Sequence, residues 1–254
     1  MFGIKEKTYI VEFNEQINHK TTKQFYKDME YVRKHKKIAS FVVIRLNCPG
    51  GSPSLSFEIA EYIKMFKKDV TVYIYIESMA TSGGYFIAAA ADKIYSNPYA
   101  IVGSIGVIIQ KFEVSGLADK VGVQEDNITV GGFKQPLSLF EPLDEEGEEY
   151  IKNQLMHPTY NLFVKYISDN RNIDIDIVKD QFADGRIFVA SESIGDLVDE
   201  TITFHQLLEN LIGDDFMKHL EFVNTIKKSL REKLGFTLNI NIPQIKNNNG
   251  LSLS

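Results

Sequence analysis

The stretch that most constrains the fold of this chain is residues 78–91, SMATSGGYFIAAAA. It follows an apolar, β-branched run at residues 70–76 that is typical of a buried strand, and it leads into an alanine-rich helix. Ser82 therefore lies at a strand-to-helix corner, followed by two glycines that leave room for a peptide backbone. Taken alone, the corner favours an ordinary helix N-cap, but it is also where a nucleophile would stand, near the positive end of a helix.

A second strand, glycine turn and helix precede this corner. Residues 39–46 predict a buried strand, residues 47–52 (NCPGGS) a turn, and residues 54–68 an amphipathic helix. Two such units in succession predict a parallel α/β sheet with right-handed connections, in which both turns emerge at the same edge. We therefore expect the glycine turn and Ser82 to be neighbours in space.

The same hydrophobic patterns predict the remaining elements. Further strands are expected at residues 8–13, 107–110 and 124–130, and further helices at residues 21–37, 114–121, 144–170, 174–182 and 205–234. We expect one domain over residues 1–234, with residues 235–254 as a flexible C-terminal tail.

Composition excludes some classes of function and location. A formal net charge of −6 and a pI near 5.5 argue against a nucleic-acid partner. Cys48 is the only cysteine, so no intrachain disulfide forms, and the N-terminus carries no apolar segment suited to a signal peptide or membrane anchor. The sequence thus predicts a soluble protein without an integral membrane segment, and the cytoplasm is its expected compartment.

An acidic run at residues 144–149 (DEEGEE) raises the question of a metal site. Negative charge in the first turn of a helix is stabilising by itself, so we interpret the run as a solvated helix start. Neither a metal nor a cofactor is predicted for this chain.

A nucleophilic serine needs a base, and the usual base is histidine. None of the five histidines falls between positions 36 and 156, the region that holds the glycine turns, which argues against a Ser-His-Asp triad and leaves His157 as the open histidine alternative. A neutral lysine can serve instead. Lys134 is the best candidate, because it follows two glycines and no acidic residue lies between positions 131 and 140.

Acyl transfer also needs donors for an oxyanion. The backbone N–H groups of Gly50 or Gly51, together with that of Gly83, could supply them, at about 3 kcal/mol per donor. A Gly-Gly turn is otherwise a common tight connection between a strand and a helix. The turn bracketed by Gly103 and Gly106 is likewise either scaffold or the wall of a substrate groove.

Four segments together resemble the signal peptide peptidase A (SppA) family of serine peptidases. They are residues 47–52 (NCPGGS), 80–92 (ATSGGYFIAAAAD), 103–107 (GSIGV) and 185–188 (GRIF), and their order and spacing match over roughly residues 8–202. The resemblance implies the fold shared by Clp protease and the crotonases, an α/β fold of repeated ββα units, here with a C-terminal helical region.

The resemblance also implies roles for particular residues. Ser82 matches the family's nucleophile and Lys134 its general base, while Gly50 or Gly51 with Gly83 falls where the family forms its oxyanion hole. The substrate, an extended peptide with small or apolar side chains, is expected to lie along a groove near Ser52, Gly103, Ser104 and Ile105.

Departures from the family pattern leave these reacting groups in place. Cys48 stands where serine is usual, and Phe86 and Phe133 stand where tyrosine is frequent. The larger departure is the missing N-terminal anchor, which puts a signal-peptide substrate in doubt and leaves misfolded proteins or phage capsid-type substrates open, with a membrane-peripheral location as the alternative to the cytoplasm.

Family members of this size form rings in which neighbouring protomers help to complete each active site, so the resemblance implies a homo-oligomer. Two other functions remain as alternatives. One is a crotonase-type enzyme acting on acyl-CoA thioesters, and the other is a non-catalytic assembly protein of the same fold.

Overall fold

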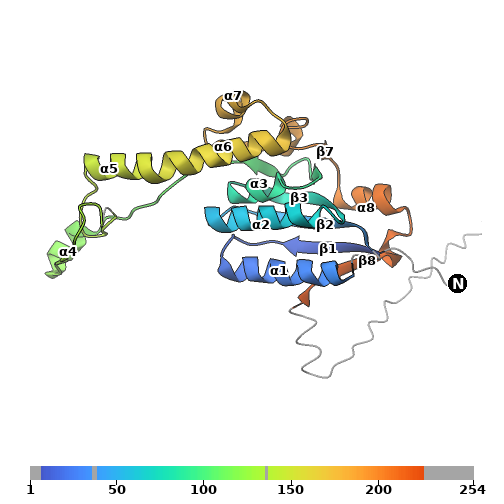
Figure 1. The fold of residues 1–254 in the computed structure, drawn as a ribbon, viewed down its shortest axis with the longest axis horizontal. Coiled ribbons are helices and arrows are strands. Elements are labelled where there is room, and N and C mark those ends of the chain that lie inside the picture. Colours follow the sequence, from blue (N-terminus) through green and yellow to red (C-terminus); the bar gives the residue numbers. More distant parts are fainter. Residues whose placement is uncertain (1–6, 36–38, 135–136, 226–254) are drawn as a thin grey trace, which may run out of the picture.

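The computed structural model describes residues 7–35, 39–134 and 137–225. In this part of the chain eight strands form one sheet (Figure 1). The main path of the sheet runs β6-β5-β3-β2-β1-β8, with β4 joining β3 and β7 joining β4. The strands are β1 Lys7–Phe13, β2 Ala39–Cys48, β3 Thr71–Thr81, β4 Lys93–Ser96, β5 Ile101–Gly103, β6 Ile187–Val189, β7 Glu200–Thr201 and β8 Leu220–Val223.

The strand pairs are parallel, except that β5 and β6 run antiparallel. Because β3 is long, it pairs first with β4 and then, near its end, with β5. This arrangement confirms the predicted parallel α/β layout, and it places the C-terminal end of β3 between the ends of β2 and β5.

Helices pack on both faces of the sheet. Successive residues of β2 show this, because Val42 and Ile44 point into a large core formed with the helices that follow the strands, while Val43 points into a smaller core. The helices are α1 His19–Lys34, α2 Pro53–Phe66, α3 Gly83–Ala88, α4 Ser115–Val121, α5 Glu145–Ile151, α6 His157–Arg171, α7 Ile175–Ile177 and α8 Phe204–Ile212. Of these, α8 covers the smaller core through Leu207 and Leu208.

Several shorter helical segments complete the chain. Two π-helical segments, Lys152–Met156 and Val178–Phe182, follow α5 and α7, and two 3₁₀ segments cover Ala190–Glu192 and Phe216–Lys218. The first π segment joins α5 to α6, so a nearly continuous helix runs over residues 145–171, as predicted. Figure 1 shows that α4 and the start of α5 lie beyond the edge of the sheet. We call residues 111–144, which contain α4, the arm.

Most elements up to the corner form where they were predicted. The strand expected at residues 8–13 is β1, and the helix expected at residues 21–37 is α1, which begins two residues earlier at His19 because Asn18 caps it in a capping box. The helices predicted at residues 114–121 and 174–182 are confirmed as α4 and as α7 with its π segment.

Two predicted strands in the middle of the chain are wrong. Residues 107–110 are not a strand, because Gly103 and Ser104 have positive φ and turn the chain away from the sheet, where β6 already pairs with β5. Residues 124–130 are also irregular, and Ile128 is 99% exposed. Among the described residues, their alternating pattern has no partner strand on which to form a ladder.

The long helix predicted at residues 205–234 is also wrong over the part that is described. Helix α8 ends at Ile212, and Gly213, at φ +98°, breaks it. The chain then returns as β8, which extends the sheet in parallel beside β1. The rest of this prediction, and the tail expected at residues 235–254, lie outside the described residues. In the described segments no helix is both long and apolar enough to span a bilayer.

Candidate active site

Ser82 lies between the end of β3 and the first residue of α3. Its backbone has φ 53° and ψ −124°, a conformation that side-chain-bearing residues rarely adopt, and its amide donates to the carbonyl oxygen of Gly103 at 2.8 Å. Its side chain makes no capping hydrogen bond to α3. Such backbone strain costs about 1–3 kcal/mol and clusters at functional sites. The ordinary N-cap interpretation of Ser82 is therefore wrong.

The glycine turn lies directly beside this serine. Gly50 and Gly51 have φ +110° and +146°, and a Cβ placed on Gly50 would come within 2.9 Å of the Ser82 Cβ. Ile17 pairs with this turn, because its amide donates to the Gly50 oxygen at 2.8 Å and its carbonyl accepts from the Ser52 amide at 3.1 Å. The predicted proximity of the two turns is confirmed.

The amides of this turn differ in what they face. The Gly50 N–H donates to the Sγ of Cys48 at 3.4 Å, so it is already engaged. Since alternate residues of an extended segment point to opposite sides, the Gly51 N–H faces away from Ile17. Burial raises the pKa of the Cys48 thiol to about 11, which keeps this side chain a neutral hydrogen-bonding group.

A cavity of about 510 Å³, called here the Ser82 cavity, opens at this corner. Its walls come from the start of α2, from α3, from α6 and from the irregular segment after β5, and most of its side chains are apolar. The lining residues are Gly51, Pro53, Ser54, Ser56, Phe57, Glu58, Ser82, Gly83, Phe86, Gly106, Val107, Ile108, Thr159, Leu162 and Phe163. The nucleophile candidate, Gly51 and Gly83 thus share one hollow.

The predicted groove residues are not among those that line this hollow. Ser52 caps α2, with its Oγ accepting from the Leu55 amide at 3.5 Å. Gly103 ends β5, and the Ser104 amide donates to the Arg186 carbonyl at 2.7 Å. Ile105 is fully buried in the core. The next residues along, Gly106 to Ile108, line the cavity, so the role of the predicted set in substrate binding stays a prediction.

Lys134 lies elsewhere in the described chain. It is exposed at the end of a turn on the arm, and it is not among the residues that line the Ser82 cavity. The turn is tied to α5, because the ring of Phe133 stacks on that of Tyr150 with centroids 4.3 Å apart and an interplanar angle of 6°. Within one copy, the described structure does not bring Lys134 and Ser82 together.

The described residues offer neither a histidine base nor a set of metal ligands beside Ser82. Among the residues that line the Ser82 cavity there is no histidine, and His157 is exposed at the start of α6. The described residues also contain no group of three or more His, Cys, Asp or Glu side chains that could hold a metal ion.

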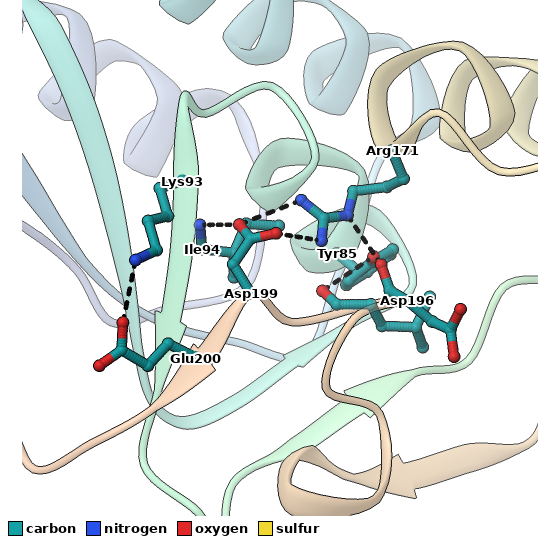
Figure 2. A network of polar contacts seen from close by, with 8 residues as sticks. Tyr85, Lys93, Ile94, Arg171, Asp196, Asp199 and Glu200 are labelled. Atoms are coloured by element: carbon teal, nitrogen blue, oxygen red, sulfur yellow. Dashed lines mark hydrogen bonds and ion pairs between the residues drawn. The ribbon is translucent and has the colours of Figure 1, made fainter.

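The helix that forms one wall of the cavity is fixed by a partly buried polar network (Figure 2). At the end of α6, the guanidinium of Arg171 donates two hydrogen bonds to Asp199 and one, from Nε, to the Asp196 carbonyl at 3.0 Å. Tyr85 of α3, three residues after Ser82, donates to the Leu197 carbonyl at 3.0 Å. The network therefore ties α6 and α3 to the same loop.

Aromatic packing gives a second tie between these helices. Phe86 of α3 stacks on Tyr166 of α6, with ring centroids 3.8 Å apart, and meets Phe163 at 5.3 Å. Sequence reasoning missed the α6 residues of the cavity, Leu162 and Phe163. For Leu162 the only signal is an apolar residue on the outer face of a helix, since its side chain is 70% exposed, whereas Phe163 is buried in the core.

The fold and the family models that match the chain define the class of protein. A family model described as Clp protease matches residues 4–122, and one described as Peptidase family S49 matches residues 64–214. The class is thus that of serine peptidases with a Clp-like α/β fold. Within it, the chain belongs to peptidase family S49.

Relatives and solved structures agree with this assignment. The chain is 34% identical over 199 residues to a putative signal peptide peptidase SppA of Enterococcus faecium, covering 78% of this chain and 56% of that protein. It is 30% identical over 230 residues to a probable protease SohB of Haemophilus influenzae, covering 89% and 63%. The chain thus spans about three fifths of the length of these relatives.

Among solved structures, the chain resembles the 1510-N membrane-bound stomatin-specific protease. A serine-to-alanine mutant of that protein matches with a TM-score of 0.58 and 16% identity, covering 87% of this chain and 98% of that one. A lysine-to-alanine mutant in complex with a substrate peptide matches with a TM-score of 0.57 and 18% identity, covering 91% and 98%. At this identity the likeness shows the fold alone.

Proposed function

We propose that this chain is a serine endopeptidase that cleaves extended peptides, with Ser82 as nucleophile and Lys134 as general base. The observation that carries the proposal is the strained backbone of Ser82. The Ser82 side chain makes no capping hydrogen bond, and Ser82 lines a largely apolar cavity together with Gly51 and Gly83. Membership of peptidase family S49 supports the reaction type.

In the proposed reaction, the neutral amine of Lys134 takes the proton from the Ser82 Oγ, which attacks the carbonyl carbon of the scissile peptide bond. Negative charge develops on the carbonyl oxygen, and this oxygen accepts hydrogen bonds from the N–H groups of Gly51 and Gly83. Lys134 then returns the proton to the leaving amine, and water hydrolyses the acyl-enzyme. Of the three predicted donors, Gly50 is the weakest candidate because its N–H already faces Cys48.

We propose that Lys134 acts on the Ser82 of a neighbouring copy in a homo-oligomer of ring type. Its exposed place on the arm, away from the Ser82 cavity of its own chain, supports this arrangement. Exposed apolar residues of the arm, such as Phe112 and Val130, give it surface to bury against another copy.

The substrate preference follows from the cavity. Phe57, Phe86 and Leu162 offer apolar surface next to the nucleophile, which suits an apolar side chain on the acyl side of the scissile bond. Whether the natural substrates are signal-peptide remnants, misfolded proteins or phage capsid-type proteins is a separate question, and peptides trapped by the Ser82→Ala variant would identify them. The cytoplasm remains the proposed compartment, and cell fractionation tests it against a membrane-peripheral location.

The test is peptide cleavage by purified variants, with labelling by a fluorophosphonate probe that acylates reactive serines. Ser82→Ala should abolish both cleavage and labelling, and Lys134→Ala should abolish cleavage. Full cleavage by either variant would exclude the dyad. Ser54→Ala is the matched control, since it removes another hydroxyl that lines the same cavity and should keep most of the activity.

A further inference from the structure

A second hollow lies beside the Ser82 cavity, on the outer side of α1. It has a volume of about 740 Å³. Its lining combines cationic side chains with aromatic and apolar ones: His19, Thr22, Lys23, Tyr26, Lys27, Glu30, Tyr31, Lys34, Leu55 and Thr225. We call it the basic groove.

The lysines of the basic groove form no ion pair within the described part of the chain. Lys23, Lys27 and Lys34 are exposed, and no ion pair joins any of them to a described acidic residue. The acidic residue of the lining, Glu30, is already held by the Arg33 guanidinium and by the Tyr62 hydroxyl. In a protein of formal net charge −6, this groove is therefore suited to a negatively charged occupant.

The start of α5 offers the complementary charge. Asp144 and the four glutamates that follow it within residues 145–149 are all exposed. Of these glutamates, Glu148 pairs with Lys152, whereas no ion pair engages Glu145, Glu146 or Glu149 in the described structure. Because this acidic end lies beyond the edge of the sheet, it is free to meet another molecule (Figure 1).

Lys134 and the acidic end of α5 belong to one packed unit. Besides the stack of Phe133 on Tyr150, Gly132 and Phe133 line a hollow together with Asp144 and Gly147. A partner that holds the acidic end therefore also holds the turn that carries Lys134.

The basic groove and the Ser82 cavity are neighbours in the same chain. They share the first turn of α2 as a partition, because Leu55 lines the basic groove while Ser54 and Ser56 line the Ser82 cavity. An element seated at the Leu55 end of the basic groove thus lies against the helix turn that walls the Ser82 cavity.

We propose that the basic groove of one copy binds the acidic N-terminal end of α5 of a second copy, and that this contact delivers Lys134 to the first copy's Ser82. The inference rests on the proposed Ser82–Lys134 dyad and names the interface that assembles it. The contact is head-to-tail, so repeating it from copy to copy gives a ring when the rotation between copies closes.

Complementation between two inactive variants tests the proposal. A Lys134→Ala chain keeps Ser82 and acts as acceptor, while a Ser82→Ala chain keeps Lys134 and acts as donor. Mixing the two should restore cleavage. Adding Lys23→Glu and Lys27→Glu to the acceptor should lower the restored rate at least tenfold, because like charges then meet across the interface. Adding Glu146→Lys and Glu149→Lys to the donor as well should recover it.

A matched control makes the same charge change elsewhere. Lys68→Glu with Lys179→Glu in the acceptor alters two lysines that line neither hollow. The restored rate should stay within about twofold of the rate obtained with the acceptor that carries Lys134→Ala alone. Sedimentation velocity supplies a readout independent of activity. The Lys23→Glu, Lys27→Glu chain should dissociate at concentrations where the native chain stays assembled, and raising the salt should weaken the native assembly by screening the contact.

The outcomes separate the inference from the function on which it rests. An unmixed native chain that neither cleaves peptides nor labels with the probe would defeat the proposed function itself. An active native chain whose two variants fail to complement would overturn the delivery of Lys134 from a second copy, and the interface with it, while leaving the peptidase function standing. A restored rate that is unaffected by the groove substitutions would overturn the interface alone. Equal losses from the groove variant and the matched control would overturn it too, as would failure of the donor charge reversal to recover the rate.

Discussion

Arg171 binds Asp199 through two parallel hydrogen bonds, with Nη2 2.7 Å from Oδ1 and Nη1 3.2 Å from Oδ2. The Arg171 side chain is only 9% exposed, so its charge depends on this partner. The same Asp199 carboxylate accepts from the Ile94 amide at 2.6 Å. One carboxylate thus joins the end of α6 to β4, and through α6 it holds a wall of the Ser82 cavity.

Breaking this pair should destabilise the fold. Asp199→Asn leaves the buried guanidinium without a countercharge, and we expect the free energy of unfolding to fall by about 2–4 kcal/mol, less than for a fully buried pair because Asp199 is partly exposed. Urea denaturation measures the change. The control is Lys165→Met, which removes an exposed ion pair on the same helix and should cost under about 0.5 kcal/mol. Equal costs for the two variants would contradict this account.

The same pair predicts a loss of stability in acid. Burial by itself would raise the pKa of the Asp199 carboxyl, but the hydrogen bonds from Arg171 and from the Ile94 amide outweigh it and hold the pKa below its ordinary value of 3.8. Because the folded-state pKa is depressed, the stabilisation is complete above the unfolded value and is lost as the pH falls through the folded one. Unfolding free energies measured between pH 6 and pH 3 should therefore fall less in Asp199→Asn than in the native chain.

Local sequence patterns were sufficient for the part of the fold that holds Ser82. The strands β1 to β3, the helices between them and the corner at Ser82 each bury a face that shows in the local spacing of apolar residues. The strained backbone of Ser82 was not predictable, because a serine before a helix is most simply an N-cap, and only the described φ of 53° separates the two cases.

Three of the failures share one cause, which is the absence or presence of a partner far away in sequence. Residues 124–130 alternate like a strand, yet no neighbouring strand is available to them in the described structure. Residues 220–223 form β8 because the free edge of β1 accepts them, although they fall inside an amphipathic helical pattern. The α6 wall of the cavity was missed for the same reason, since Leu162 reaches the Ser82 cavity through tertiary packing alone.

The strain at Ser82 predicts that Ser82→Gly is more stable than Ser82→Ala, which reverses the usual order of glycine and alanine. Glycine is normally less favourable than alanine, but at φ 53° the Cβ of alanine keeps the strain that glycine removes. We expect Ser82→Gly to be more stable than Ser82→Ala by about 1 kcal/mol, which raises the melting temperature by about 2–4 °C. Differential scanning calorimetry decides the point, and a more stable alanine variant would show that the corner carries no strain.

The Cys48 thiol should be nearly inert in the folded protein. Burial raises its pKa to about 11, so at pH 8 only about one thiol in a thousand is ionised, and the thiolate is the reactive form. Alkylation by iodoacetamide should be at least 100-fold slower, to order of magnitude, in the native chain than in urea, where the thiol regains its ordinary pKa near 8.5. Similar rates in the two states would mean that the glycine turn opens readily.

Alanine substitution should affect peptide cleavage at Gly50, in the glycine turn, but not at Gly116, an ordinary helix glycine. In Gly50→Ala the new Cβ would lie 2.9 Å from the Ser82 Cβ and 3.0 Å from the Gly83 nitrogen, and φ +110° is strained for any side chain. We expect peptide cleavage to fall at least tenfold, because the clash displaces both the proposed nucleophile and a proposed oxyanion donor by tenths of an ångström. Gly116→Ala is the control, since its Cβ would meet nothing within 4 Å inside α4 and should raise stability by up to about 1 kcal/mol. Cleavage by Gly50→Ala at the rate of the control would mean that the close approach of the two turns has no part in catalysis.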